Sequence, residues 1–282
     1  MSRNRFIESL LFPKPRLDED GLRRSMAGKT ILITGASSGI GEKLAYLLGR
    51  TDACLVLVAR RMDKLEAIRE AIASQGGKVS VYAADLREES ELDALSAWLR
   101  ERPQGLDIVF SNAGKSIRRP VMESLDRFHD FQRTMAVNYF APVRLLLAVL
   151  PELERRRGHI VNVSTINASL IPFPYWAAYQ ASKSAFDTWL RAAAPELNAR
   201  GIRVTSCYLP LVRTPMIEPT AAYRKLPAMS PEHAARWIAA AVLANRRTIA
   251  PWWLPPGQLA SLIGRGLWEW AMPHLLRRRE GE

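Results

Sequence analysis

The chain has 282 residues, of which 48% are hydrophobic, and this is enough apolar material for one large domain with a buried core rather than a disordered chain. Its 40 lysines and arginines against 28 acidic residues give a formal net charge of +12, which favours anionic partners such as nucleotides, coenzyme A, acidic lipid or nucleic acid. The two cysteines, Cys54 and Cys207, lie in apolar strand-like runs, so we expect reduced thiols and a cytoplasmic location.

Residues 1–28 are predicted to form an N-terminal extension, because the strongest strand signal begins only at Thr30. The apolar run at residues 6–12 is interrupted by two polar residues and ended by Pro13, so it is too short and too polar for a signal peptide. No stretch reaches the roughly 18 uninterrupted apolar residues that a membrane-spanning helix needs. The four histidines lie far apart in the sequence, and we expect no metal site.

Apolar strand-like runs alternate with helical patterns from residue 30 to about residue 245. The runs are ILIT, CLVLVA, VSVYAAD, LDIVFSNAG, GHIVNVS and IRVTSCYLP. Because strands and helices alternate and the strands are apolar throughout, the pattern predicts a parallel sheet covered by helices on both faces. The predicted domain spans residues 29–250 and includes a proline-rich substrate loop at 210–232.

The first strand leads directly into the glycine-rich sequence TGASSGIG at residues 34–41 and then into a helix. Glycines allow a tight turn and a close backbone approach, and the N-H groups at the start of the helix can hold a pyrophosphate. The spacing GxxxGxG differs from the dinucleotide fingerprint GxGxxG, so the glycines alone also fit an ordinary strand-to-helix turn. Their position after a first strand favours a Rossmann-type, doubly wound α/β domain with N- and C-terminal extensions. The predicted cofactor contacts here are Gly35, Ser37, Ser38, Gly39, Ile40 and Gly41.

The second strand ends in Arg60 and Arg61, and no acidic residue follows until Asp63. Proteins that bind NAD place an acidic residue near this point for the ribose hydroxyls, whereas arginine binds the 2′-phosphate of NADP. The sequence therefore predicts NADP(H) as the cofactor, with Arg60 and Ser37 as the phosphate contacts and Arg61 beside them. The alternative is that both arginines are solvated surface residues.

The segment YQASK places Tyr179 and Lys183 four residues apart in a predicted helix, so the two side chains share one face. A free tyrosine has a pKa of about 10, but a neighbouring ammonium group stabilises the phenolate and lowers that pKa. The pair can then serve as an acid-base group. This spacing also arises by chance, so its meaning depends on the rest of the chain.

Over about residues 28–245 the chain resembles the short-chain dehydrogenase/reductase family. The resemblance lies in TGASSGIG, Asp85-Leu86, Ser111-Asn112-Ala113-Gly114, Asn138, Ser164-Thr165, YQASK and Pro210-Leu211-Val212-Arg213-Thr214, in the family's order. It implies an oxidoreductase that interconverts a carbonyl and an alcohol by hydride transfer with NADP(H). It also implies that the cofactor is contacted by Asp85, Leu86, Asn112, Ala113, Gly114, Tyr179, Lys183, Pro210, Val212 and Thr214.

The resemblance implies that Tyr179 is the general acid or base and that Lys183 lowers its pKa and holds the nicotinamide ribose. Asn138 would support a water-linked proton relay. The family's carbonyl-polarising serine commonly precedes the tyrosine by 13 residues, whereas Thr165 precedes Tyr179 by 14. An alignment from the preceding strand gives this role to Thr165, which we favour, with Ser164 as the alternative.

The loop from Pro210 onward resembles the reductase module of bacterial fatty acyl reductases. Leu211 stands where the short-chain dehydrogenase/reductase family usually has a glycine. This implies a small hydrophobic substrate such as an acyl-CoA, a fatty aldehyde or another long-chain carbonyl compound. The alternatives are a compact ketone or alcohol such as a steroid, or a non-catalytic NADP-sensing protein, which would be expected to lose Tyr179 or Lys183. The chain has no nucleic-acid-binding motif, so no nucleic-acid partner is expected.

The C-terminal tail at residues 251–282 is rich in tryptophan and leucine and ends in Arg277-Arg278-Arg279. Such a segment either packs on its own domain or on another subunit, which is the commoner case, or lies in a lipid interface. We therefore expect a cytoplasmic homo-oligomer, a dimer or a tetramer, with peripheral membrane contact through the tail as the alternative.

Overall fold

The computed structural model contains one seven-stranded parallel sheet with the strand order β3-β2-β1-β4-β5-β6-β7. It describes residues 3–218, 220, 223 and 226–280, and within these the side chains from Ile7 to Arg277. The strands are β1 (Thr30–Thr34), β2 (Cys54–Ala59), β3 (Lys78–Ala83), β4 (Ile108–Ser111), β5 (His159–Thr165), β6 (Arg203–Leu209) and β7 (Thr248–Ile249). The order reverses between β1 and β4, as in a doubly wound fold, so the predicted fold class is confirmed.

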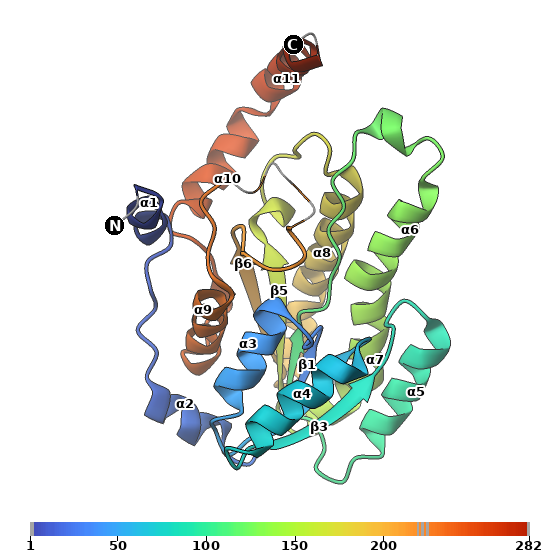
Figure 1. Cartoon of the computed structure of the whole chain (residues 1–282), viewed down its shortest axis with the longest axis vertical. Coiled ribbons are helices and arrows are strands. Elements are labelled where there is room, and N and C mark those ends of the chain that lie inside the picture. Colours follow the sequence, from blue (N-terminus) through green and yellow to red (C-terminus); the bar gives the residue numbers. More distant parts are fainter. Residues whose placement is uncertain (1–2, 219, 221–222, 224–225, 281–282) are drawn as a thin grey trace.

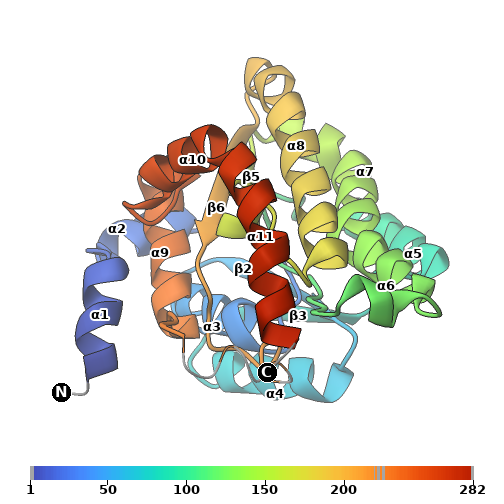
Figure 2. The ribbon, with the colours of Figure 1, turned by 90° about the horizontal axis from the view of Figure 1, so that it is seen from above.

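Helices lie on both faces of the sheet (Figures 1 and 2). Those that precede the sheet or follow the first five strands are α1 (Arg3–Leu11), α2 (Glu19–Met26), α3 (Gly39–Leu48), α4 (Met62–Ala73), α5 (Glu89–Arg100), α6 (Phe128–Met135), α7 (Ala141–Arg155) and α8 (Ala177–Ala199). The later ones are α9 (Pro231–Leu243), α10 (Leu254–Ile263) and α11 (Arg265–Glu280). Three short helical turns are η1 (Val121–Ser124), the π-helical turn η2 (Ala136–Phe140) and η3 (Ile166–Ala168).

The strands divide their apolar side chains between two cores, because successive residues of a strand point to opposite faces. Ile31 and Ile33 of β1 pack with α3, α4 and α9, whereas Leu32 packs with α5, α7 and α8. Both cysteines are free thiols, as expected, and Cys207 is fully buried. Burial of β1, β2, β4, β5 and β6 on both faces explains why their sequences are apolar without alternation, whereas the edge strands β3 and β7 are only partly buried or exposed.

The predicted N-terminal extension is packed on the domain rather than separate from it. Phe12, Leu22 and Met26 are buried in the core that contains α9. The indole N-H of Trp237 in α9 donates to the carbonyl of Pro13 at 2.9 Å. The described part of the extension therefore covers the outer side of α9.

The continuous run from α6 through η2 to α7 is, within the described residues, the one helix long and apolar enough to cross a membrane by length and composition. Leu145, Leu146, Val149 and Leu153 of α7 are buried against the sheet. A layer helix of an α/β domain has this same apolar character, and the position of α7 in the fold accounts for it.

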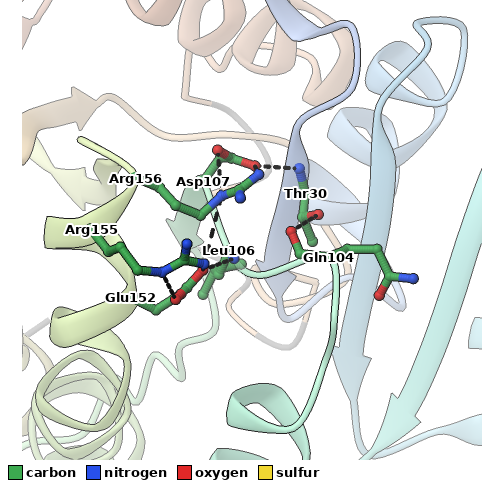
Figure 3. Close-up of polar contacts among 7 residues, drawn as sticks. All are labelled: Thr30, Gln104, Leu106, Asp107, Glu152, Arg155 and Arg156. Atoms are coloured by element: carbon green, nitrogen blue, oxygen red, sulfur yellow. Dashed lines mark hydrogen bonds and ion pairs between the residues drawn. The ribbon is translucent and has the colours of Figure 1, made fainter.

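The amino ends of the central strands are joined through Asp107, which lies just before β4 (Figure 3). Its carboxylate accepts hydrogen bonds from the backbone N-H of Thr30 at 2.8 Å and from Arg156 Nε at 2.9 Å. Its backbone bonds to Thr30 on one side and His159 on the other, at 2.9 and 2.8 Å. One residue therefore connects the starts of β1, β4 and β5 and fixes their register.

Replacement of Asp107 by alanine is expected to lower the free energy of unfolding by about 1–3 kcal/mol, because the Thr30 N-H and the Arg156 guanidinium lose their acceptor. Urea denaturation followed by circular dichroism measures this change. The control is Arg155→Ala, which removes an exposed ion pair with Glu152 and should cost less than about 0.5 kcal/mol. Equal losses for the two variants would contradict the role of Asp107.

Candidate active site

A cavity of about 730 Å³ opens at the carboxyl ends of the strands, where the strand order reverses. This volume is typical of pockets for small molecules and cofactors. Every residue predicted from the sequence as a site residue lines it except Gly41, Asp85 and Asn138. The predicted residues thus come together from loops that are far apart in the chain.

The glycine-rich loop is folded so that only glycine fits at two positions. Gly35 has a φ of +67°, and a Cβ atom there would lie 2.8 Å from the Cα of Ala113. A Cβ on Gly41 would lie 2.5 Å from the carbonyl oxygen of Gly35. Helix α3 begins at Gly39, and the side chain of Ser38 does not cap it. The first N-H groups of α3 are therefore left for a ligand, which fits a bound pyrophosphate.

Basic side chains gather at the end of the cavity next to β2. Arg61 donates to Ser37 Oγ at 3.0 Å, and Arg60 lies 3.8 Å from the carboxylate of Asp85. Arg87 and Lys115 also line this end, although the sequence analysis did not identify them. Both stand beside recognised motifs, but charge and position alone do not reveal where a side chain points. The cluster is suited to a multiply charged anion such as a nucleotide 2′-phosphate.

Asp85 was expected to contact the cofactor, but it does not line the cavity, and its carboxylate is bound by Arg87. Arg87 Nε donates to both of its oxygens, at 3.0 and 3.1 Å. This hydrogen bonding from Arg87 holds the pKa of Asp85 below its usual range. The next residue, Leu86, lines the cavity in its place.

Asn138 does not line the cavity either, but lies in the π-helical turn η2 and braces the loop that follows β4. Its side-chain oxygen accepts from the backbone N-H of Lys115 at 2.8 Å. Its amide group donates to the Lys115 carbonyl at 2.9 Å and to Ser182 Oγ at 2.8 Å. Both amide hydrogens are thus engaged, and the side chain joins this loop to α8. A π-turn at such a point is a frequent feature of functional sites.

Tyr179 and Lys183 lie on the cavity side of α8, as their spacing predicted. The apolar surroundings of the half-buried Tyr179 raise the pKa of its phenol, and a hydrogen bond with Thr165 acts in the opposite direction. Lys183 is buried, which lowers its pKa to about 8, and its Nζ donates to the Val163 carbonyl at 3.3 Å. The raised pKa keeps the phenol of Tyr179 protonated at neutral pH, and its hydrogen-bond partner is Thr165.

Ser164 and Thr165, the two alternatives for the carbonyl-polarising hydroxyl, end β5 and both line the cavity. Thr165 bonds to Tyr179 and also accepts from the backbone N-H of Asn167 at 3.3 Å. Ser164 Oγ is buried without a hydrogen-bond partner among the described residues. Thr165 is therefore placed beside the phenol of Tyr179, and the hydroxyl of Ser164 is available to a ligand.

An aromatic wall continues the cavity beyond Tyr179. The ring of Trp176 stacks on that of Tyr223 at 5.1 Å and lies 6.4 Å from the ring of Tyr179. The sequence analysis missed this wall, although Trp176 precedes Tyr179 by three residues and so shares its helix face. The predicted substrate loop at 210–232 contributes Met216, Ile217, Tyr223 and Leu226, whereas residues 219, 221–222 and 224–225 lie outside the described residues. The phenol of Tyr179 thus faces a space with one basic and one apolar end.

Comparisons with known proteins agree with this geometry. The family described as short chain dehydrogenase matches residues 29–225. A fatty acyl-CoA reductase of Acinetobacter baylyi is 44% identical over 241 residues, which are 85% of this chain and 80% of the relative. A fatty acyl-CoA reductase of Mycobacterium tuberculosis is 44% identical over 227 residues, 80% of this chain and 77% of the relative. The solved structure of a short-chain dehydrogenase from Sphingobium yanoikuyae in complex with NADPH has a TM-score of 0.74 and 27% identity, covering 86% of this chain and 95% of that one.

The double substitution Arg60→Ala/Arg61→Ala is expected to weaken the binding of NADPH by about tenfold or more, because each charge-assisted hydrogen bond to the 2′-phosphate contributes about 1.5–3 kcal/mol. Titration of intrinsic tryptophan fluorescence measures the dissociation constant. NADH serves as the matched control ligand, since it lacks that phosphate and its affinity should not change. An equal loss for both nucleotides would contradict the assignment of these arginines.

Proposed function

The chain belongs to the short-chain dehydrogenase family and is an oxidoreductase, and from this we propose that it reduces long-chain fatty acyl-CoA to the aldehyde with NADPH. The observation that carries the proposal is the position of the protonated Tyr179, beside Thr165, between a basic and an apolar arm of one cavity. The basic arm is the end of the cavity next to β2, and it fits the phosphates of NADPH. The aromatic arm is the end lined by Trp176 and Tyr223, and it fits an alkyl chain. The relatives named fatty acyl-CoA reductase support the substrate class.

The proposed reaction begins with the thioester carbonyl placed against Tyr179 and Thr165. Its carbon accepts a hydride, which is the chemistry that NADPH supplies when it is bound. The Tyr179 phenol gives its proton to the carbonyl oxygen, and the Thr165 hydroxyl donates a hydrogen bond to that oxygen. Lys183 holds positive charge near the phenolate that forms. The first product is a thiohemiacetal.

The second step breaks the carbon-sulfur bond. The new hydroxyl returns its proton to the Tyr179 phenolate, the carbonyl re-forms, and the CoA thiolate leaves and takes a proton from solvent. The products are the aldehyde, CoA thiol and NADP⁺, and Tyr179 is again protonated. The raised pKa of Tyr179 suits this direction, because reduction needs the phenol in its protonated form.

Arg118 supplies a positive charge at the outer edge of the aromatic arm. Its side chain is exposed, and the guanidinium lies 4.7 Å from the ring centre of Tyr175, the neighbour of Trp176. Within the described part of the chain it makes no ion pair, whereas the adjacent Arg119 is bound to Asp130 at 3.2 Å. We infer that Arg118 meets a phosphate of the CoA moiety, which neutral carbonyl compounds lack.

The substitution Tyr179→Phe is expected to lower kcat for palmitoyl-CoA by at least about 100-fold, because the proton donor is lost while the aromatic ring stays. NADPH consumption measures turnover, and fluorescence titration should show that NADPH still binds. The control is Tyr82→Phe, which changes a tyrosine that packs on Trp98 away from the cavity and should leave turnover unchanged. Turnover of compact cyclic ketones alone, or tight NADPH binding without any turnover, would contradict the proposed reaction.

The substitution Arg118→Ala is expected to raise KM for palmitoyl-CoA by about 3- to 30-fold, the effect of losing one partly solvated contact between guanidinium and phosphate. The matched substrate is the palmitoyl thioester of N-acetylcysteamine, which keeps the thioester and the chain but carries no phosphate. Its KM should not change. A rise in KM for both thioesters, or for neither, would contradict the contact between Arg118 and a CoA phosphate. Neither result would contradict the proposed reaction.

A further inference from the structure

Large apolar side chains are exposed mainly at one end of the molecule. Among the described residues with large exposed apolar side chains, only Met62, Phe140 and Leu147 lie elsewhere. The others belong to α1, the segment from η1 to the start of α6, the loops around the cavity, and the stretch from residue 252 through α10 and α11. They are Leu10, Val121, Met122, Leu125, Phe128, Phe173, Met216, Leu226, Trp252, Leu259, Leu262, Ile263, Leu267, Trp270 and Leu275. We call this set the apolar rim.

The apolar rim surrounds the mouth of the cavity. Phe173, Met216 and Leu226 line the cavity and are also exposed, so they mark its opening. The ring of Trp268 in α11 lies 5.3 Å from that of Phe173, and its indole N-H donates to the carbonyl of Pro172 at 3.2 Å. Helices α10 and α11 therefore extend the mouth outward, and α11 passes over this end of the molecule (Figures 1 and 2).

The other margin of the mouth comes from the loop after β4. The backbone N-H of Arg119 donates to the carbonyl of Tyr175 at 2.8 Å, which attaches this loop to the segment before α8. Val121 and Met122, with 61% and 75% of their surface exposed, follow directly. Exposed apolar residues thus lie on both sides of the opening. Exposed apolar side chains gathered around an opening in this way indicate a contact with a protein or a membrane.

The arrangement favours a lipid surface as the partner. A second copy of the chain pressed onto both margins would close the mouth, whereas a fluid bilayer covers the same side chains and leaves a path for an acyl chain. Helices α10 and α11 have 10 and 16 residues and are separated by Gly264, so each is shorter than the about 20 residues of a spanning helix. Helices of this length, with tryptophan and terminal arginine, suit the interface instead.

Charge agrees with an anionic bilayer in particular. The chain carries a net charge of +12, α1 begins with Arg3 and includes Arg5, and α11 contains a run of three arginines from Arg277. Basic residues near an anionic membrane surface add electrostatic attraction to it. Exposed tryptophans, here Trp252 and Trp270, are favoured at the depth of the lipid headgroups.

We propose that the apolar rim docks on an anionic phospholipid bilayer, so that a long-chain substrate passes from the membrane surface into the cavity. The path of the substrate rests on the function proposed above, whereas the docking itself does not. The rim delivers the alkyl chain to the aromatic arm, and the polar head of the substrate stays at the aqueous side with Arg118. The membrane is thus a partner of the enzyme in substrate capture.

The test is flotation of the full chain with vesicles of phosphatidylglycerol and phosphatidylethanolamine, without substrate or cofactor. The wild type should rise with the vesicles. The rim variant Leu262→Ser/Ile263→Ser changes two side chains that are each 76% exposed and should stay in the aqueous fraction. The matched control Phe140→Ser/Leu147→Ser removes similarly exposed apolar surface, 60% and 56%, from another face and should float like the wild type. Thermal denaturation checks that both variants fold.

The proposal is overturned if the wild type stays in the aqueous fraction, or if both variants lose flotation together. It is equally overturned if the rim variant floats normally but changes from a larger to a smaller species in analytical ultracentrifugation, because a second copy would then cover the rim. Reduction of hexanoyl-CoA, a soluble short-chain thioester, should be the same in the rim variant and the wild type. If the wild type reduces acyl-CoA but does not float with the vesicles, only the docking proposal is contradicted. If it floats but does not reduce acyl-CoA, only the proposed reaction is contradicted.

Discussion

The carboxyl ends of β1 and β4 meet through short hydrogen bonds, and the geometry of the whole site depends on this contact. The Thr34 hydroxyl accepts from the backbone N-H groups of Asn112 and Ala113, both at 3.0 Å, and the Asn112 amide donates to the Thr34 carbonyl at 2.9 Å. Gly35 is in contact with Ala113, where no Cβ atom fits. The two loops that border the cavity are therefore held together at the point where the strand order reverses.

A second set of hydrogen bonds connects this contact to α8, the helix that carries Tyr179 and Lys183. The loop after β4 continues to Lys115, whose backbone pairs with the Asn138 side chain, and Asn138 in turn donates to Ser182 of α8. Ser182 lies between Tyr179 and Lys183 in the sequence. The glycine-rich loop and Tyr179 thus keep a fixed relative position, although they lie far apart in the chain. Buried, fully satisfied networks of this kind specify a single arrangement.

Sequence patterns predicted the features that depend on neighbouring residues. Alternating strands and helices, the glycine-rich turn and the shared face of Tyr179 and Lys183 are local properties, and each recurs in the structure. Local patterns could not predict contacts between segments that are distant in the chain. Examples are the hydrogen bond from Arg61 to Ser37 and the stacking of Trp176 on Tyr223. The sequence argument predicted a lowered pKa for Tyr179, because it considered only the charge of Lys183. The pKa is raised instead, because burial dominates and burial depends on the whole fold.

Burial connects the substrate class with the direction of the reaction. The apolar surroundings that suit an alkyl chain also disfavour charge, so they raise the pKa of Tyr179 and lower that of Lys183 to about 8. A protonated phenol is ready to donate to a carbonyl oxygen, whereas oxidation of an alcohol would first require the phenolate. A more polar cavity would bring the phenol closer to its ordinary pKa but would bind a lipid chain less well. The same desolvation therefore supports both parts of the proposed function, a hydrophobic substrate and its reduction.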